Sequence, residues 1–153
     1  NRGTAHYNMD EFDAAFQDCN RAIELDPQFA SAYHGRGLAL DHLGDLSGAM
    51  RDFDRAIELD PNFAIAYLSR GAGHHRQHDL DAAIKDYDRA IALNPRLADA
   101  YLLRASANTS RGESASARVV ADLRTYLELN PAAVTREQIE QWAVSLEQQL
   151  TNP

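Results

Sequence analysis

One octapeptide pattern recurs along the chain at a fixed interval. It reads NRAIELDP at positions 20–27, DRAIELDP at 54–61 and DRAIALNP at 88–95, so each copy is separated from the next by the same distance. A period of about 34 residues is typical of architectures in which one small unit is stacked on the next. The period therefore constrains the fold more than any other feature of the sequence.

Each copy ends at a proline that stops a helix. Pro27, Pro61 and Pro95 follow the same period, and Pro131 comes slightly later than the period requires. In the first three copies alanines stand five and twelve positions before the proline, and a larger side chain or Cys19 stands eight positions before it. These intervals place the residues on one helical stripe. Since proline disfavours helical geometry in the residue before it, the helix is expected to end there.

The segment after each proline repeats as well. Two rows in it keep the period of the octapeptide, namely Tyr33, Tyr67 and Tyr101, and Gly3, Gly37 and Gly71. A glycine inside a helix costs about 1 kcal/mol, so its recurrence predicts a close crossing with a second helix. Turns between the paired helices are predicted around Met9–Asp10, Gly44–Asp45, His78–Asp79 and Gly112–Glu113.

A unit of this period with a helix, a tight turn, a second helix and a proline-led turn resembles the tetratricopeptide repeat. The resemblance covers a partial copy at 1–27 and further copies at 28–61, 62–95 and 96–131. It implies an all-α fold, a right-handed superhelical solenoid of antiparallel helix hairpins whose first helices line a concave groove. One hairpin cannot bury its apolar face alone, so stacked neighbours must form the core.

The last segment predicts a single helix over 135–150. Thr135 with Gln138 has the pattern of a capping box at its start. One apolar stripe follows, formed by Ile139, Trp142, Ala143, Leu146 and Leu150. Such a helix suits the exposed end of a solenoid, with Trp142 packed beneath it rather than anchoring a ligand. We expect residues 1–153 to form one tetratricopeptide domain.

Composition excludes several classes of protein. The chain of 153 residues has a net charge of −8 and one lysine, Lys85, so binding to nucleic acid is not expected. No stretch approaches the about 20 apolar residues of a membrane span, so we expect a soluble protein, cytoplasmic or exported. Cys19 is the single cysteine and can form no intramolecular disulfide. Because the first residue falls inside a repeat, we expect the natural chain to begin earlier.

An arginine and an aspartate also recur once per copy. The rows are Arg2, Arg36, Arg70 and Arg104, and Asp18, Asp52, Asp86 and Asp122. A row of arginines could bind an anionic ligand, since guanidinium pairs well with carboxylate and phosphate. Alternatively, each arginine pairs with an aspartate of the same or the adjacent hairpin. The matching recurrence of both signs favours the structural pairing.

No set of residues predicts an enzyme. His74, His75 and His78 form the sharpest cluster, and His74 and His78 have the spacing that lets two rings share a metal ion. However, His74 occupies the position of Leu40 in the previous copy, and HHRQH lacks the general-base glutamate of a zinc-peptidase helix. We therefore predict no metal and no other cofactor. Cys19 occupies a core position and is interpreted as a packing residue.

The face of each first helix that points away from its partner helix is the predicted peptide-binding surface. Its members are Thr4, Tyr7, Asn8, Ser31, His34, Leu38, Asp41, His42, Ile65, Leu68, Ser69, Ala72, His75, Arg76, Asp99, Leu102, Leu103 and Ser106. The leucines in this set have no core to bury them. They favour an apolar peptide segment or a helix as the ligand.

The best-known tetratricopeptide clamp grips an acidic chaperone tail with Lys, Asn and Arg. Here the matching positions hold residues such as Thr4, Gly35, Asp99 and Leu103, so an acidic tail is not the expected partner. The sequence predicts a non-catalytic scaffold that binds a peptide or helix of a partner protein in the concave groove. Two alternatives stay open: a structural module that forms homo-oligomers through its open N-terminal edge or its groove, and a metal-dependent enzyme at the histidine cluster.

Overall fold

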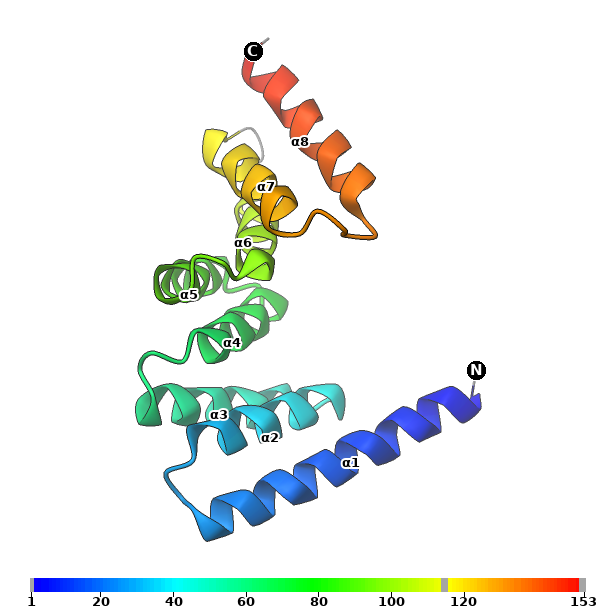
Figure 1. Cartoon of the computed structure of the whole chain (residues 1–153), viewed down its shortest axis with the longest axis vertical. Helices are drawn as coiled ribbons and strands as arrows, with labels where there is room; N and C mark the ends of the chain where they lie inside the picture. Colours follow the sequence, from blue (N-terminus) through cyan, green and yellow to red (C-terminus); the bar gives the residue numbers. More distant parts are fainter. Residues whose placement is uncertain (1, 114–115, 152–153) are drawn as a thin grey trace. The chain divides into compact units, whose positions relative to one another are not determined.

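The computed structural model describes the backbone of residues 2–113 and 116–151 and, within these ranges, the side chains from residue 11 onward. In this part the chain is all-α and contains no β-strand (Figure 1). Its helices are α1 (Arg2–Leu25), α2 (Ala30–His42), α3 (Leu46–Leu59), α4 (Ala64–Arg76), α5 (Leu80–Leu93), α6 (Ala98–Ser110), α7 (Ala117–Leu129) and α8 (Arg136–Thr151).

The chain divides into two compact units, residues 1–73 and residues 74–153. In the first unit α2 packs against α1 and α3. In the second unit α6 packs against α5 and α7, and α7 packs against α8. Within each unit these successive helices pack on one another, which confirms the predicted all-α solenoid class. The single domain and its repeat bounds stay a prediction.

The first three proline-led turns share one hydrogen bond. The side-chain oxygen of the residue before the proline accepts from the backbone N–H two residues further on: Asp26 from Gln28 at 2.9 Å, Asp60 from Asn62 at 3.0 Å and Asn94 from Arg96 at 3.1 Å. Asp and Asn favour this arrangement because their short side chains reach the nearby backbone. The helices end one residue earlier, as the prolines predict.

The tight turns within hairpins use a left-handed residue. Gly44 has φ 91°, Gly112 has φ 96° and His78 has φ 61°. Glycine adopts this conformation without steric cost. Asp45 then caps α3 by accepting from the backbone N–H of Gly48 at 2.8 Å, and the later turns are followed by caps of the same kind. The turns predicted at these three places are confirmed.

The turn predicted around Met9–Asp10 is wrong, because α1 runs unbroken through it. In the second copy Gly44 supplies the left-handed residue and Asp45 the helix cap. The first copy has Asp10 and Glu11 at these positions. Glutamate is not among the residues that cap a helix well, and no glycine opens the turn, so one helix continues.

Close helix crossing at glycine is confirmed in the first unit. A Cβ atom added to Gly37 of α2 would lie 2.6 Å from the ring of Phe53 on α3 and 3.2 Å from the carbonyl oxygen of Ala49. Real side chains do not approach so closely, so only glycine permits this packing. Phe53, Ala49 and Ala56 form the buried face of α3 at the centre of the unit.

The core of the second unit lies where α6, α7 and α8 meet. It contains Ala105, Val119, Leu123, Tyr126, Leu127, Ile139, Ala143 and Leu146. Trp142 is half-buried and packs against this cluster, which confirms its predicted packing role. Leu150, the last residue of the predicted stripe, is exposed. The helix begins at Arg136, directly after the Thr135 that the sequence marks as its cap.

Candidate functional site

A tyrosine ties each first helix to the turn that precedes it. The phenolic O–H of Tyr33 donates to the carbonyl oxygen of Pro27 at 3.4 Å, that of Tyr67 to Pro61 at 3.4 Å and that of Tyr101 to Pro95 at 3.1 Å. The tyrosine and the proline therefore recur together for one geometric reason. This bond fixes where the first helix starts relative to the end of the preceding second helix.

The arginine three residues after each tyrosine lies over its ring. The guanidinium carbon is 5.4 Å from the ring centroid for Arg36, 5.5 Å for Arg70 and 5.6 Å for Arg104. A cation over an aromatic face is attracted by the ring quadrupole, and each contact of this kind contributes about 0.5–1 kcal/mol at exposed sites. The contact also holds each guanidinium in position for its carboxylate partners.

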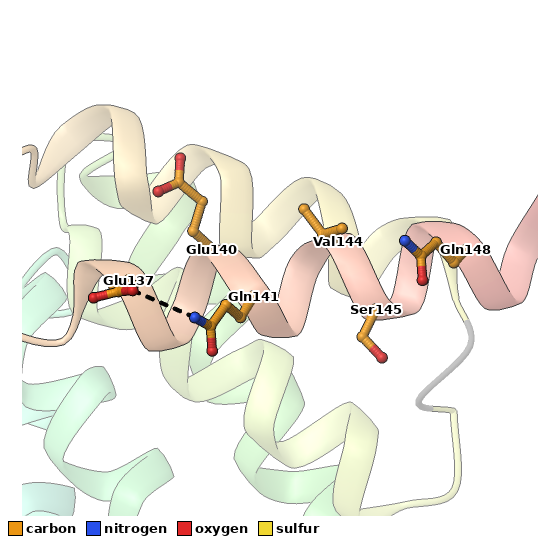
Figure 2. A pocket seen from close by; sticks show the side chains of 6 residues that line it. All are labelled: Glu137, Glu140, Gln141, Val144, Ser145 and Gln148. Atoms are coloured by element: carbon orange, nitrogen blue, oxygen red, sulfur yellow. Dashed lines mark hydrogen bonds between the residues drawn. The ribbon is translucent and has the colours of Figure 1, made fainter.

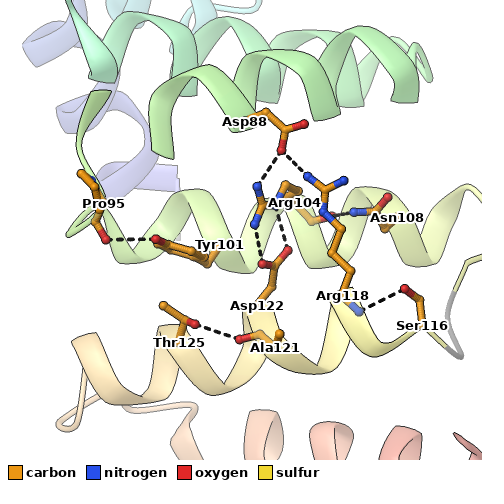
Figure 3. Close-up of polar contacts among 10 residues, drawn as sticks. All are labelled: Asp88, Pro95, Tyr101, Arg104, Asn108, Ser116, Arg118, Ala121, Asp122 and Thr125. Carbon is orange, nitrogen blue, oxygen red and sulfur yellow. Dashed lines mark hydrogen bonds and ion pairs between the residues drawn. The ribbon is translucent and has the colours of Figure 1, made fainter. Parts of the chain in front are cut away.

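Arg104 joins three helices of the second unit (Figure 3). Its guanidinium donates to both carboxylate oxygens of Asp122 on α7, at 2.9 and 2.6 Å, and to Asp88 on α5 at 2.6 Å. Arg118 of α7 binds the same Asp88 oxygen. The side chains of Arg104 and Asp122 are 12% and 4% exposed, so this pair lies in a largely desolvated place.

The first unit has the same arrangement with one difference. Arg36 of α2 donates to both oxygens of Asp52 on α3, at 2.7 and 2.6 Å, and to the amide oxygen of Asn20 on α1 at 2.8 Å. Arg70 of α4 donates to Asp54 of α3 at 2.8 Å. The predicted pairing with an aspartate of the same or the adjacent hairpin is therefore confirmed for Arg36, Arg70 and Arg104. The side chain of Arg2 lies outside the part of the chain whose side chains the structure describes.

Sequence reasoning missed one partner of each paired arginine, which lies on the helix before it. Asn20, Asp54 and Asp88, which bind the arginines from the preceding helix, themselves recur with the period of the octapeptide. A search for every recurring polar position, rather than for the aspartates alone, would have found them. Arg36 and Arg104 thus each connect their own helix to the helix before it and to the helix after it.

The first unit places two large apolar residues of the predicted surface in water. Leu38 of α2 is 39% exposed and Ile65 of α4 is 46% exposed. Ser31 is also exposed, while Leu68 and Ala72 are half-buried. These residues come from two successive first helices.

His34 lies within this predicted surface but is buried. Its Nε2 is 2.9 Å from the hydroxyl oxygen of Ser69 on α4, which joins two predicted surface residues. Its ring packs on Phe53, with centroids 5.7 Å apart, and against the edge of Phe63 at 5.2 Å. Burial lowers the pKa of His34, so the ring is neutral at pH 7.

Two other members of the set lie on the same helix. His42 is exposed and stacks on the ring of Phe12 of α1, with centroids 4.0 Å apart. Asp41 is half-buried. Thr4, Tyr7 and Asn8 lie outside the residues whose side chains the structure describes.

In the second unit the predicted surface is more covered. Leu102 of α6 is half-buried and packs against the core cluster of α6, α7 and α8. Leu103, Ser106 and His75 are half-buried, and only Asp99 and Arg76 are exposed. The described part of the predicted surface therefore has its most exposed large apolar side chains in the first unit.

Two of the residues considered for chemistry, Cys19 and His74, have described neighbours. The Sγ of Cys19 lies 2.9 Å from the position that a Cβ of Gly35 would occupy, and burial raises the pKa of its thiol. His74 Nε2 is 3.9 Å from a carboxylate oxygen of Asp86. Among the described residues, no three His, Cys, Asp or Glu side chains form a group that could hold a metal ion. Within the same ranges, none of the helices is both long and apolar enough to cross a membrane.

Comparisons with solved structures show the fold. The crystal structure of MamA aligns over 96% of this chain and 95% of its own, with a TM-score of 0.73 and 21% identity. The first TPR of Spaghetti (RPAP3), bound to the HSP90 peptide SRMEEVD, aligns over 83% of this chain and 97% of its own, with a TM-score of 0.71 and 21% identity. The TPR2B domain of yeast Sti1, in complex with pHsp70, aligns over 78% and 97%, with a TM-score of 0.69 and 23% identity.

A family comparison goes further than the fold. No curated protein matches this sequence. The family model of the tetratricopeptide repeat, however, matches residues 2–70 and again residues 71–143. These two matches together span most of the chain and end within α8. The chain belongs to the tetratricopeptide repeat family, whose domains generally serve as protein–protein interaction modules and are typically non-catalytic.

Proposed function

We propose that this chain is a non-catalytic scaffold that binds a peptide or helix of a partner protein on the face of its first helices. The observation that carries the proposal is the exposure of Leu38 and Ile65 on α2 and α4. Each is a large apolar side chain that the described residues cover only in part. Burying such a side chain from full exposure contributes about 1.5–3 kcal/mol, so covering the part still exposed contributes roughly half of that or less, which favours an apolar ligand.

The rigidity of the first helices supports the same function. Tyr33 and Arg36 hold α2 through groups that point away from Leu38, toward the preceding turn and toward α3. Tyr67 ties α4 to the turn before it, and Arg70 ties α4 to Asp54 of the preceding helix α3. The exposed leucine and isoleucine are thus presented on fixed helices, and a ligand does not have to order them on binding.

The charges of this face favour an apolar ligand over an acidic one. The peptide SRMEEVD, seen with the first TPR of Spaghetti, contains three acidic residues. On this chain the predicted surface includes Asp41 and Asp99, and the single lysine, Lys85, lies on the second helix α5. Arg36 is already bound to Asp52. An acidic tail would meet the carboxylates of Asp41 and Asp99 and one arginine of the predicted set, Arg76, whereas an apolar helix could cover Leu38 and Ile65.

Affinity capture with a matched pair of variants tests the proposal. Leu38→Glu/Ile65→Glu places two charges on the proposed surface. Leu25→Glu/Val134→Glu places two charges on exposed apolar residues of other segments. Partners captured from lysate by each variant are compared by quantitative mass spectrometry, after circular dichroism has shown equal helicity.

We expect one partner to be retained by the wild type and by the control variant and lost by Leu38→Glu/Ile65→Glu. A photo-crosslinking residue at position 38 should then join that partner to α2. Loss in both variants would show that general apolar contact drives capture and would contradict the proposal. Capture of this chain alone would favour the self-assembling structural module. Stoichiometric metal in the purified protein would favour the metal-dependent enzyme.

A further inference from the structure

The outward side of α8 carries a shallow hollow that the proposed peptide surface does not include (Figure 2). Its volume is about 310 Å³, and it is lined by Glu137, Glu140, Gln141, Val144, Ser145 and Gln148. We refer to these six residues as the outer α8 face. Val144 at its centre is 40% exposed, and in the part of the chain that the structure describes no helix covers it.

Comparison with α6, the first helix of the preceding hairpin, shows which side of a repeat helix the outer α8 face corresponds to. On α6, which packs against α5, one side is formed by the fully buried Ala100 and Ala107, and Arg104 between them binds Asp88 of α5 as well as Asp122 of α7. The adjacent side packs on α7, with Ala105 in the shared core and Tyr101 against it. A helix inside this repeat is therefore covered on two adjacent sides, on one by the helix before it and on the other by the helix after it.

Helix α8 repeats the first side and leaves the second open. Its residues Ile139, Ala143 and Leu146 are buried against α7 at the spacing of positions 100, 104 and 107 on α6. One residue further on, Glu140 and Val144 occupy the places of Tyr101 and Ala105. The outer α8 face thus has the position along the helix of a helix-binding side of the repeat, with an acidic residue where α2, α4 and α6 carry tyrosine.

The carboxylates of this face are only weakly engaged. Glu137 accepts one long hydrogen bond, at 3.5 Å, from Gln141. Glu140 lies 3.6 Å from Arg136 one turn away, and both side chains are exposed. Arg124 of α7 also lies near Glu140, but its guanidinium donates to Glu147. Surface pairs of this kind contribute roughly 0–1 kcal/mol, so a partner cation can compete for them. Glu147 differs, because both its oxygens accept from Arg124 of α7 and fasten α8 to the core.

We propose that the outer α8 face binds a basic amphipathic helix of a partner protein. An apolar residue of that helix packs on Val144, and Lys or Arg side chains beside it pair with Glu137 and Glu140. Charge complementarity selects this occupant, since two carboxylates, Glu137 and Glu140, and no Lys or Arg stand among the six residues that line the hollow. A second copy bound through the same face is disfavoured, because a two-fold contact would place its glutamates against those of the first copy.

A fluorescent peptide of about 20 residues, long enough to form a helix on binding, serves as the probe. It contains leucine on one face and lysine on the flanks, and a second peptide has glutamate in place of every lysine. Binding is followed by fluorescence anisotropy at about 150 mM salt, where long-range charge effects are screened. The emission of Trp142, the only tryptophan, reports on α8 directly.

Three variants are compared with the wild type. Glu137→Lys/Glu140→Lys reverses the charge of the outer α8 face. Glu11→Lys/Glu24→Lys makes the same change in net charge on exposed residues of α1. Leu38→Glu/Ile65→Glu alters the proposed peptide surface and leaves α8 unchanged.

We expect the lysine peptide to bind the wild type, the α1 variant and the Leu38→Glu/Ile65→Glu variant alike. It should bind the α8 variant at least about tenfold more weakly, which corresponds to about 1.4 kcal/mol. The glutamate peptide should bind only the α8 variant. Equal binding of the lysine peptide by the wild type and the α8 variant would overturn the proposal. So would loss in the Leu38→Glu/Ile65→Glu variant, or a wild-type dimer that Val144→Asp dissociates and that binds no peptide.

Discussion

The same arginine position meets different neighbours in the two compact units. In the first unit Arg36 binds one carboxylate, that of Asp52, and the neutral amide of Asn20. In the second unit Arg104 binds two carboxylates, those of Asp122 and Asp88. The period of the repeat fixes where the guanidinium lies, whereas the residue on the preceding helix decides how much charge it must neutralise. Helix geometry is repeated more faithfully than electrostatics.

The largest expected effect comes from removing the arginine. Arg104→Met leaves the buried carboxylate of Asp122 without a cation and should lower the free energy of unfolding by about 3–5 kcal/mol, because an unpaired buried charge is costly. Arg36→Met should cost less, since Asn20 is neutral and Asp52 is then the one carboxylate released. Hydrogen exchange resolved along the chain measures the loss separately in residues 11–73 and 74–151.

Arg21→Met provides the control for both variants. Arg21 pairs with Glu24 three residues away on α1, and both side chains are largely exposed. Its loss should change stability by less than about 1 kcal/mol. Equal costs for Arg36→Met and Arg104→Met would show that the identity of the residue from the preceding helix does not matter, and the comparison would fail.

Phe53 of the first unit and Tyr87 of the second occupy the same position of the repeat and differ by a hydroxyl group. Both side chains are fully or almost fully buried, but Tyr87 carries a hydroxyl that has no hydrogen-bond partner among the described residues. Burial raises the pKa of Tyr87, so the hydroxyl stays protonated. Phe53→Tyr should destabilise the protein by about 1–3 kcal/mol because it buries a second unpaired hydroxyl. Tyr87→Phe should be neutral or stabilising.

Thermal unfolding of Phe53→Tyr and Tyr87→Phe measures both changes in stability. The control is Tyr101→Phe, which removes a hydroxyl that does have a partner, the carbonyl oxygen of Pro95. That change should cost about 0.5–1.5 kcal/mol. If Tyr87→Phe is as harmful as Tyr101→Phe, the hydroxyl of Tyr87 has a partner in solution and the contrast between the units disappears.

Acid should affect the two units differently. His34 is buried in the first unit, and the equivalent position of the second unit, two periods further on, is Leu102. Burial lowers the pKa of His34 in the folded chain, so the unfolded chain binds a proton more readily. The contribution to stability is complete above the unfolded value of about 6.5 and is lost as the pH falls below it. A lowering of the pKa by one on folding corresponds to about 1.4 kcal/mol in the free energy of unfolding.

We expect hydrogen exchange in residues 11–73 to accelerate between pH 7 and pH 5, after correction for the intrinsic exchange rate. His34→Leu, which copies position 102, should remove this acid sensitivity. His42→Leu should keep it, because the ring of His42 is exposed. An unchanged pH profile in His34→Leu would contradict the assignment of the effect to His34.

The period and the residue types predicted the local structure well. Proline positions and the side-chain oxygen before each proline defined the ends of the second helices, and glycine followed by aspartate defined the tight turns. These signals act within a few residues, so one sequence is enough to find them. The unbroken α1 departs from the period because Asp10 and Glu11 stand where the other copies have their turn. The period alone predicts a turn there, but the glycine and the capping aspartate that form one are absent.

The candidate surface was harder to predict, because exposure depends on neighbours from other helices. A helical projection of α2 puts His34 beside Leu38, yet Phe53 and Phe63 cover His34 and leave Leu38 in water. Similarly, Leu102 repeats the position of Leu68 but packs against the core that α8 helps to form. Periodicity states which residues share a face and does not state what covers it.

The smallest contrast concerns one backbone angle. Gly44 and His78 hold the same left-handed position in equivalent turns, each donating its N–H to a carbonyl oxygen three residues earlier at 3.1 and 3.0 Å. For a residue with a side chain this conformation costs about 1–2 kcal/mol. His78→Gly should recover that cost but lose about 0.4–1 kcal/mol through the greater freedom of glycine in the unfolded chain. The net gain should be about 0.5 kcal/mol.

The reciprocal change, Gly44→His, should cost about the same, because a Cβ at Gly44 would meet no other atom within 4 Å and only the backbone angle is altered. Melting temperatures of both variants and of His75→Gly, which removes a neighbouring histidine from the helical part of α4, provide the measurement. His75→Gly should destabilise, since glycine is unfavourable within a helix. A gain from His75→Gly as large as that from His78→Gly would mean that loss of the imidazole, and not relief of the backbone, stabilises this turn.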